Sequence, residues 1–311
     1  MRKLIKSIAF RFLRGLGSWL TNERNLPRLR VVQEFFERAA GHPTAVCMVQ
    51  QKYPGLIYDQ AKKARLRNFQ QKFYSQFSED GLIMYFLDQI GAPNKTFIEF
   101  GIEDGTECNA AHLAINFGWK GLFIEGDPDQ AERARHFYHQ QHPIKPEHVK
   151  IKNHFITLEN VNDLFKEHGF EGEIDLLSID IDGVDYHVWE AINNIQPRLV
   201  ISEYNAVFGR DRSVTVPYDP KFDRDDYHSS GICFGMSLKA ANKLAEKKGY
   251  VLVGCESSGS NAFFVRKDLA EAANLDTFTP EEAFYPCRPR LRAQTQEEQW
   301  DTVKDCTLVE V

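Results

Sequence analysis

The chain has 311 residues, 42% of them hydrophobic and 26% charged, with a formal net charge of −6. This composition is that of a soluble globular protein, long enough for one large domain with appendages or for two small domains. Its six cysteines are widely spaced with no Cys-x-x-Cys pair, which excludes a small disulfide-stapled fold, argues against a zinc site and predicts reduced thiols in a cytoplasmic protein.

The N-terminal part of the chain has a different charge from the rest. Residues 1–72 hold 15 Lys and Arg against 4 Asp and Glu, whereas the remainder holds 23 against 40. Residues 1–20 place apolar side chains at helical spacing among basic ones, which predicts a basic amphipathic helix. Such a helix suits the surface of an anionic membrane, packing on its own domain or another subunit, or a transit-type presequence. It is neither a secretory signal nor a membrane span.

Three parts are predicted along the chain. Residues 1–70 form a basic helical N-terminal region with further helices at 28–40 and 58–74, residues 71–285 form the main domain, and residues 286–311 form a C-terminal tail. The basic helices are followed by no nucleic-acid-binding motif, so we expect no nucleic-acid partner.

Two short apolar segments of the main domain end in acidic residues. Thr96–Phe100 leads into an acidic, glycine-bearing turn and a helix, and Gly121–Glu125 follows as a second buried strand. This spacing is typical of a strand-helix-strand unit that binds a nucleoside, with the second acid on the ribose hydroxyls; an ordinary unit of this kind without a ligand is the alternative. The predicted cofactor contacts, including one acid from a later strand, are Glu99, Gly101, Asp104, Gly105, Glu125 and Asp180.

The charge around the turn indicates which nucleoside binds. A dinucleotide site would have Gly-x-Gly-x-x-Gly, but only Gly101 and Gly105 stand in register, and carboxylates surround them. Carboxylates repel a pyrophosphate and attract the ammonium group of a methionine moiety, so S-adenosylmethionine fits better than NAD.

The remaining elements alternate between helix and strand. The fold class is therefore α/β, with a Rossmann-like, mostly parallel seven-stranded sheet that ends in an antiparallel hairpin, as in methyltransferases. Residues 206–235 are polar with little apolar periodicity, which predicts a lid or binding loop. The further predicted helices are 79–90, 107–117, 128–141, 159–168, 186–195 and 237–248, and the further strands are 148–156, 174–183, 198–205, 250–254 and 261–266.

Acidic residues close four of the predicted parallel strands. Ligands of open parallel sheets bind beyond the carboxyl ends of the strands. We therefore expect Glu99, Glu125, Asp182 and Glu203 to lie along one rim.

Four segments of the main domain follow recognisable motifs. Tyr74–Asp80 reads Tyr-Ser-Gln-Phe-Ser-Glu-Asp, Phe97–Gly105 contains the first acidic turn, Gly118–Glu125 reads Gly-Trp-Lys-Gly-Leu-Phe-Ile-Glu, and Ser178–Asp185 reads Ser-Ile-Asp-Ile-Asp-Gly-Val-Asp. Together they resemble the FkbM-type methyltransferases over about residues 74–269. The resemblance implies an S-adenosylmethionine-dependent methyltransferase with Glu125 as the ribose acid.

The segments also depart from the family's pattern. Ser178 stands where the family has lysine, and Asp182 and Asp185 stand where it has glutamates. These changes fall near the expected acceptor pocket, so the resemblance implies methyl transfer but does not identify the acceptor.

A sugar hydroxyl needs a base before it can accept a methyl group. Asp182 is the first candidate, with His187 and the lid residue His228 as others. Asp180, Asp182, Glu203 and Asn205 also offer oxygen ligands for Mg²⁺, which would draw a hydroxyl toward its alkoxide, and the predicted ligands among them are Asp182, Glu203 and Asn205. Otherwise these side chains hold the cofactor and the acceptor by hydrogen bonds.

The predicted function is O-methylation of a glycan, a lipid-linked sugar or a small metabolite in the cytoplasm. Residues 1–20 are the candidate contact with the inner face of a membrane, and the oligomeric state is left open, a homo-oligomer included. The alternatives are a catalytically silent methyltransferase-like scaffold and an NAD-linked sugar-modifying enzyme.

Overall fold

The computed structural model describes residues 62–311. The chain divides into two units, residues 1–60 and 61–311, and the described residues belong to the second. The helices predicted within 1–20 and 28–40 lie outside the described residues. Of the helix predicted at 58–74, the described part is α4 (Lys62–Arg67), and residues 68–74 are not helical.

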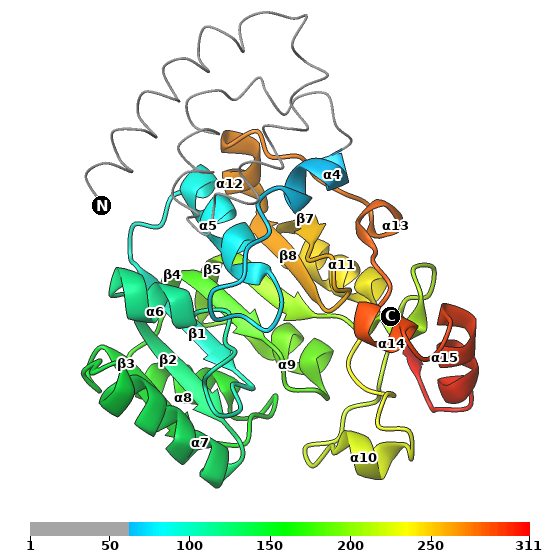
Figure 1. Ribbon diagram of the computed structural model, residues 1–311, viewed down its shortest axis with the longest axis horizontal. Helices are drawn as coiled ribbons and strands as arrows, with labels where there is room; N and C mark the ends of the chain where they lie inside the picture. The colour runs from blue at the N-terminus through cyan, green and yellow to red at the C-terminus, as the bar shows by residue number, and fades with distance from the viewer. Residues whose placement is uncertain (1–61) are drawn as a thin grey trace, which may run out of the picture. The chain divides into compact units, whose positions relative to one another are not determined.

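A seven-stranded sheet forms the centre of the second unit (Figure 1). Its strand order is β3-β2-β1-β4-β5-β8-β7, with β1 to β5 parallel and β8 antiparallel to both β5 and β7. The predicted mostly parallel sheet with a terminal antiparallel hairpin is confirmed. The strands are β1 (Thr96–Phe100), β2 (Lys120–Glu125), β3 (Val149–Asn153), β4 (Gly172–Ile179), β5 (Ile195–Glu203), β7 (Tyr250–Cys255) and β8 (Asn261–Arg266).

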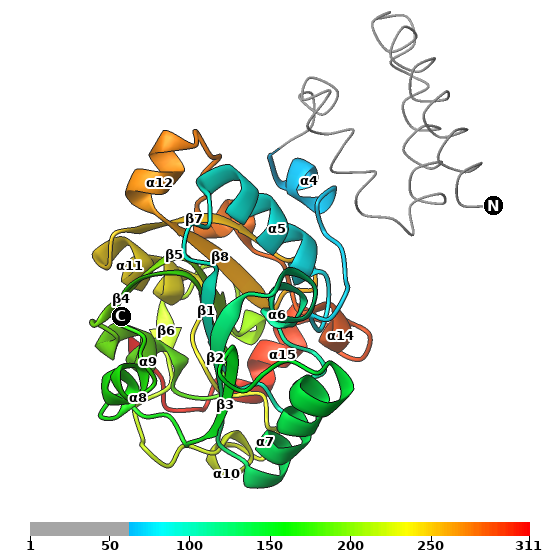
Figure 2. The same ribbon diagram turned by 90° about the vertical axis from the view of Figure 1, so that its left-hand side faces the viewer.

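Helices cover both faces of the sheet, which explains why its inner strands are continuous apolar runs. Figure 2 shows the sheet close to edge-on, with α5, α6 and α7 on one face and α8, α9 and α11 on the other. A π-helix, His136–Gln141, continues α7. The helix bounds are α5 (Glu79–Ile90), α6 (Ala111–Phe117), α7 (Pro128–Arg135), α8 (Val161–Glu167), α9 (Asp185–Ala191), α11 (Leu238–Lys247) and α12 (Lys267–Ala272).

One predicted helix was too long. The apolar pattern extended it to Ile195, but α9 ends at Ala191 because Ile195 already belongs to β5, where it pairs with Gly172 of β4. A buried isoleucine fits the apolar pattern of a helix and that of a strand equally well. The backbone pairing with β4 is what assigns Ile195 to the strand.

The predicted lid and tail contain short elements that pack together. Within 206–235 lie η4 (Ala206–Phe208), β6 (Val214–Thr215) and α10 (Arg224–Tyr227). After α13 (Pro280–Ala283), the tail contains α14 (Arg288–Leu291), α15 (Gln296–Val303) and β9 (Val309–Glu310). β9 pairs antiparallel with β6 in a second, two-stranded sheet that was not predicted.

Helix α5 is fixed at its start by a buried aspartate. Oδ2 of Asp80 accepts the backbone N–H groups of Phe73, Tyr74 and Ser75 at 2.7, 2.8 and 2.9 Å, and the Ser75 hydroxyl at 2.8 Å. The same carboxylate lies at the positive end of the helix dipole, which stabilises its charge. This clamp fixes the chain segment that leads into the site.

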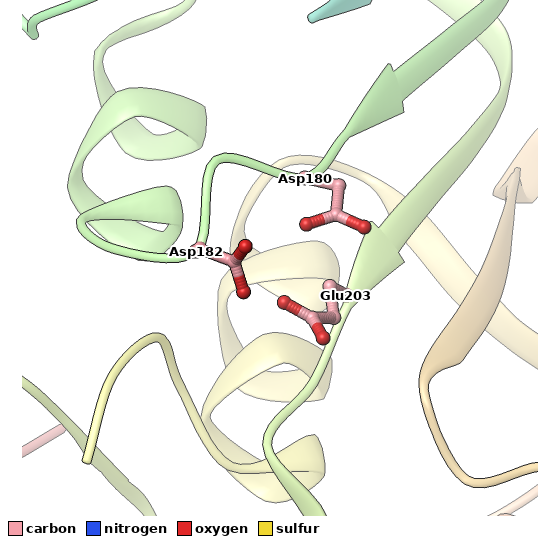
Figure 3. A group of neighbouring side chains, drawn as sticks. All are labelled: Asp180, Asp182 and Glu203. Carbon is pink, nitrogen blue, oxygen red and sulfur yellow. The ribbon is translucent and has the colours of Figure 1, made fainter. Parts of the chain in front are cut away.

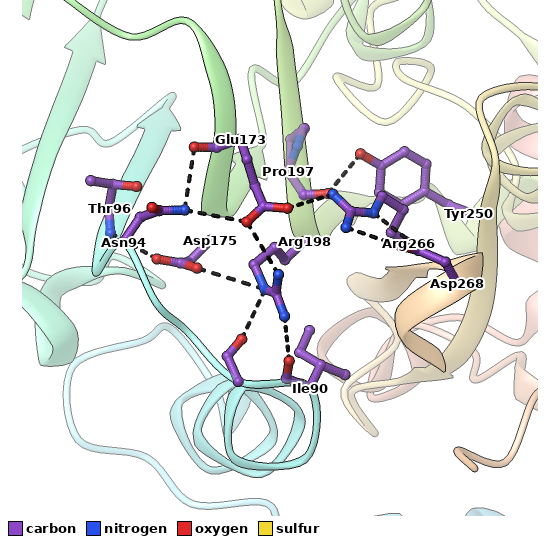
Figure 4. Close-up of polar contacts among 11 residues, drawn as sticks. Ile90, Asn94, Thr96, Glu173, Asp175, Pro197, Arg198, Tyr250, Arg266 and Asp268 are labelled. Atoms are coloured by element: carbon purple, nitrogen blue, oxygen red, sulfur yellow. Dashed lines mark hydrogen bonds and ion pairs between the residues drawn. The ribbon is translucent and has the colours of Figure 1, made fainter. Parts of the chain in front are cut away.

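The far end of α5 is joined to the sheet by Arg198 of β5 (Figure 4). Its guanidinium donates to the carbonyls of Ile90 and Gly91, which the helix itself leaves without partners, and lies 3.2 Å from Glu173 and 3.8 Å from the buried Asp175. Burial raises the pKa of Asp175, and Arg198 opposes that rise. This ion-pair network lies at the amino ends of the strands, away from the site.

Among residues 62–311, no helix has the length and apolar character that crossing a bilayer requires.

Candidate active site

A cavity of about 510 Å³ opens beyond the carboxyl ends of β1, β2, β4 and β5. Its wall contains the four expected rim acids, Glu99, Glu125, Asp182 and Glu203, and also Asp180. The cavity therefore lies where the parallel topology places ligands.

The turn after β1 is shaped by close backbone contacts. Gly101 has φ 75°, and a Cβ atom there would lie 1.4 Å from the carbonyl oxygen of Asp180, so only glycine fits. The buried carboxylate of Glu99 accepts the N–H groups of Asn109 and Ala110 at 2.8 and 2.7 Å. Burial raises the pKa of Glu99 to about 7, although these two bonds oppose the rise. Glu99 thus holds the start of α6 while lining the cavity.

Two other residues of the turn lie beside the cavity wall rather than in it. Asp104 Oδ1 accepts the N–H and hydroxyl of Thr106, and a Cβ atom on Gly105 would lie 2.8 Å from the ring of Tyr138. Neither residue is part of the described cavity lining. Their positions favour a role in shaping the turn.

Glu125 is held in place at the end of β2. One of its oxygens accepts the N–H of Glu103 at 2.8 Å, and the other accepts the N–H of Asp127 at 2.9 Å. Each carboxylate oxygen has two acceptor positions, so one on each remains for a ligand. Glu125 is therefore fixed in the cavity wall, and these two bonds leave one acceptor position open on each of its oxygens.

The ends of β4 and β5 bring three carboxylates together (Figure 3). One oxygen each of Asp180, Asp182 and Glu203 lies within 4.8 Å of the others. Burial first, and then the neighbouring acids, raise the pKa of both Asp180 and Glu203 well above the usual range. A cation would relieve this repulsion.

Asp182 lies in a constrained loop after β4. Its φ is 51°, which is rare for a residue with a side chain. Asp185 holds this loop, since its two oxygens accept the N–H groups of Ile181 and Gly183 at 2.9 and 3.0 Å. From the lid, Arg224 of α10 forms an ion pair with Asp182 at 2.6 Å.

The structure does not bring every predicted residue to the cavity. The His187 ring is oriented by a 2.9 Å hydrogen bond from Nε2 to the carbonyl of Val216, and His228 pairs with Ser230. Neither histidine is part of the described lining. Asp182 therefore remains the candidate base.

The predicted metal ligands are only partly assembled. Asp182 and Glu203 approach each other, but the third carboxylate is Asp180. The amide of Asn205 instead donates to the carbonyls of Ile232 and Phe234, and its oxygen accepts from Arg290. Asp180 was expected to offer an oxygen at this place as well, whereas the Asn205 side chain is engaged by two backbone carbonyls and Arg290.

Sequence reasoning missed several lining residues. The Phe155 ring follows β3, is 55% exposed and lies in the cavity wall, as do Asn261 of β8, Arg224 of the lid and Arg290 of the tail. Phe155 lies near the end of the strand predicted at 148–156, and this position was an available signal. Asn261 begins the strand predicted at 261–266, but no motif marks it as a site residue, and Arg224 and Arg290 come from segments without a motif.

This sheet order, with a reversed β8 and an acidic cavity at the carboxyl ends of the parallel strands, defines a Rossmann-like methyltransferase. Residues 88–252, more than half of the chain, match the model of the methyltransferase FkbM domain. The chain belongs to the FkbM methyltransferase family and is an S-adenosylmethionine-dependent methyltransferase. No curated protein sequence matches it.

Solved structures of other methyltransferases are distantly similar. An O-methyltransferase from Bacillus cereus in complex with SAH is 14% identical, with a TM-score of 0.39 over 70% of this chain and 95% of the other. A putative caffeoyl-CoA O-methyltransferase from Staphylococcus aureus is 14% identical, with a TM-score of 0.42 over 78% and 100%. The N-terminal domain of EvdMO1 with SAH bound is 13% identical, with a TM-score of 0.39 over 62% and 80%. These similarities are too distant to indicate a substrate.

Proposed function

We propose that the protein transfers a methyl group from S-adenosylmethionine to an oxygen of a glycan, a lipid-linked sugar or a small metabolite. The observation that carries this proposal is the convergence of strand-end carboxylates on one cavity of about 510 Å³. Carboxylates of raised pKa favour a cationic ligand over a pyrophosphate. The cofactor's ammonium and sulfonium groups fit this donor set.

In this proposal the chain's own residues divide the work. Glu125 receives the ribose hydroxyls, and the exposed Phe155 ring offers a stacking surface for the adenine. Asp180 and Glu203 attract the positive charge. When bound, the cofactor supplies a methyl group on a positively charged sulfur, which a neighbouring oxygen can attack.

Asp182 takes the proton of the acceptor hydroxyl. The Asp185 carboxylate supports this role because it fixes the backbone on both sides of Asp182. The ion pair with Arg224 holds the Asp182 carboxylate in the cavity wall, and the acceptor hydroxyl replaces this contact. General-base assistance of this kind contributes about 10² to 10⁴ in rate.

The cofactor is tested by isothermal titration calorimetry of the full chain with S-adenosylhomocysteine. We expect Glu125→Ala to weaken binding at least about tenfold, because two hydrogen bonds to a carboxylate are lost. Glu132→Ala, an exposed change on α7, is the matched control and leaves binding unchanged, and NAD gives no heat. Folded protein without heat from S-adenosylhomocysteine would favour the silent-scaffold alternative.

The base is tested once an acceptor has been found by screening. Asp182→Asn keeps the size of the side chain and removes the proton acceptor, so we expect kcat to fall at least about a hundredfold while S-adenosylhomocysteine still binds. An unchanged kcat would eliminate Asp182 as the base. Binding without turnover on every acceptor, in the unmodified protein, would again favour the scaffold.

Mg²⁺ at Asp180, Asp182 and Glu203 is the alternative use of these acids, in place of the base and of the contact with the cofactor's positive charge. Three carboxylate oxygens within 4.8 Å of one another suit a hard cation. Bound there, the ion would polarise the acceptor hydroxyl, and Arg224 would have to release Asp182. Chelation with EDTA is expected to lower turnover at least about tenfold, with recovery on adding Mg²⁺; full turnover in EDTA contradicts this alternative alone.

A further inference from the structure

A second cavity, of about 410 Å³, adjoins the first one. The two share Gln76, Phe77 and Pro289 in their walls. The second cavity is enclosed by the segment before α5, by the turn between β7 and β8, and by α14 of the tail. Every residue that lines it lies before or after residues 88–252, the part of the chain that matches a methyltransferase family model.

The wall of this second cavity is basic. Lys72, Arg288 and Arg292 line it, against the single acid Glu256. This balance is the reverse of the rest of the chain after residue 72, where acids outnumber Lys and Arg by 40 to 23. The positive charge is therefore a local feature of the cavity.

Two of the three basic side chains carry no ion pair among the described residues. Lys72 lies 2.7 Å from Glu107, but Arg288 and Arg292, at either end of α14, have no carboxylate within ion-pair distance in residues 62–311. They are four residues apart, so a helical turn places them on one side. Two exposed, unpaired guanidinium groups at one cavity are suited to bind a phosphate by paired hydrogen bonds.

A buried hydroxyl in the same wall lacks a partner. Ser258 is only 4% exposed, and its Oγ makes no hydrogen bond with any of residues 62–311. Its backbone N–H donates to Glu256 at 2.6 Å, which leaves the hydroxyl as the uncommitted group of the turn. An unsatisfied buried hydroxyl destabilises the folded protein, and a hydrogen bond to a ligand would remove this penalty.

We propose that the second cavity binds a phosphate group of the methyl acceptor, held by Arg288, Arg292 and the Ser258 hydroxyl. The acceptor then extends past Phe77 and Pro289 into the first cavity, where its hydroxyl meets Asp182. The acceptor class is thus a phosphate-bearing sugar or metabolite rather than a neutral glycan. The role of this phosphate site rests on the methyl transfer proposed above, whereas the binding of phosphate itself does not.

The test uses the full chain saturated with S-adenosylhomocysteine and titrated with inorganic pyrophosphate at low ionic strength. The double variant Arg288→Gln/Arg292→Gln is expected to weaken pyrophosphate binding at least about tenfold, because charge-assisted hydrogen bonds are lost. The matched control, Arg210→Gln/Lys304→Gln, removes two exposed charges that line neither cavity and is expected to change affinity by less than about twofold. Ser258→Ala tests the hydroxyl without changing charge and should also weaken binding.

The outcomes separate this inference from the proposed function. Pyrophosphate that fails to bind, or that binds equally well to the arginine variant, overturns the phosphate site, and so does an equal loss in the control pair. S-adenosylhomocysteine binding is measured in the same samples and is expected to be unchanged in every variant. If that cofactor product fails to bind while pyrophosphate binding still depends on the two arginines, the phosphate site stands and the methyltransferase proposal fails.

Discussion

Glu79, the first residue of α5, gives the clearest prediction about pH. The side chain is fully buried, accepting the N–H of Phe77 at 3.0 Å and the side-chain amide of Asn261 at 2.9 Å. Burial, and then the neighbouring Glu256, raise its pKa from 4.5 to about 7. Its ionisation is therefore disfavoured in the folded protein.

The sign of the effect follows from this raised pKa. The folded state binds the Glu79 proton more tightly than the unfolded state, so the stability that this group contributes is complete below about pH 4.5 and is lost as the pH rises through about 7. The difference between the two pKa values corresponds to about 3 kcal/mol in the free energy of unfolding. Most of that loss, about 2 kcal/mol or more, falls between about pH 5 and about pH 8.

Glu79→Gln removes the ionisable group and keeps its shape. The glutamine oxygen can still accept the Phe77 N–H, and its amide can donate to the Asn261 oxygen, which has no partner within the described part of the chain. We expect the variant to be more stable than the unmodified protein at about pH 8. Its advantage should shrink by about 2 kcal/mol or more at about pH 5.

Urea denaturation at the two pH values measures this difference, with exposed Glu147→Gln as the control. Burial also raises the pKa of Glu99 to about 7 and that of Asp185 to about 6. Both groups remain in each protein, so their contribution cancels in the comparison. An equal pH dependence in the unmodified protein and in Glu79→Gln would refute the reasoning.

Other predictions concern the frame around the site and the N-terminal region. Asp80→Ala should lower the free energy of unfolding by about 3 kcal/mol, since three backbone N–H groups lose their acceptor, whereas exposed Asp88→Ala should have little effect in the same urea titration. Arg198→Met should by itself lower the free energy of unfolding by about 3 kcal/mol, because Asp175 stays buried without its cation. A Tm equal to that of the unmodified protein would contradict this. Deleting residues 1–27 should abolish co-sedimentation with anionic vesicles; unchanged sedimentation would eliminate residues 1–20 as a membrane contact.

The sheet and its rim were predictable because they depend on local patterns. Strands β1 and β4 are apolar runs that end in acids, and parallel topology alone brings Glu99, Asp182 and Glu203 to the same edge. The cofactor-binding and catalytic roles assigned to these residues stay predictions. What the structure adds is the bonding of each carboxylate to the turns around it.

The other half of the site depends on contacts distant in sequence. Arg224 reaches Asp182 from a loop without periodicity, and Arg290 reaches Asn205 from the tail. The amide of Asn205 is a good metal ligand by type, yet it binds the backbone near Phe234 because that segment packs against it. Tertiary packing determines these contacts, and the periodicity of a single sequence does not reveal them.

The two adjoining cavities carry opposite charge, and each charge favours a different partner of the proposed reaction. Asp180 and Glu203 repel each other in a poorly solvated place, so a cation there is stabilised and a neutral sulfur, left after methyl transfer, is not. Arg288 and Arg292 have the opposite preference and would hold an acidic acceptor by its phosphate. A substrate with one anionic end and one neutral hydroxyl then has a single favourable orientation across the shared wall. Charge separation between the cavities would thus select both the acceptor and the hydroxyl that is methylated.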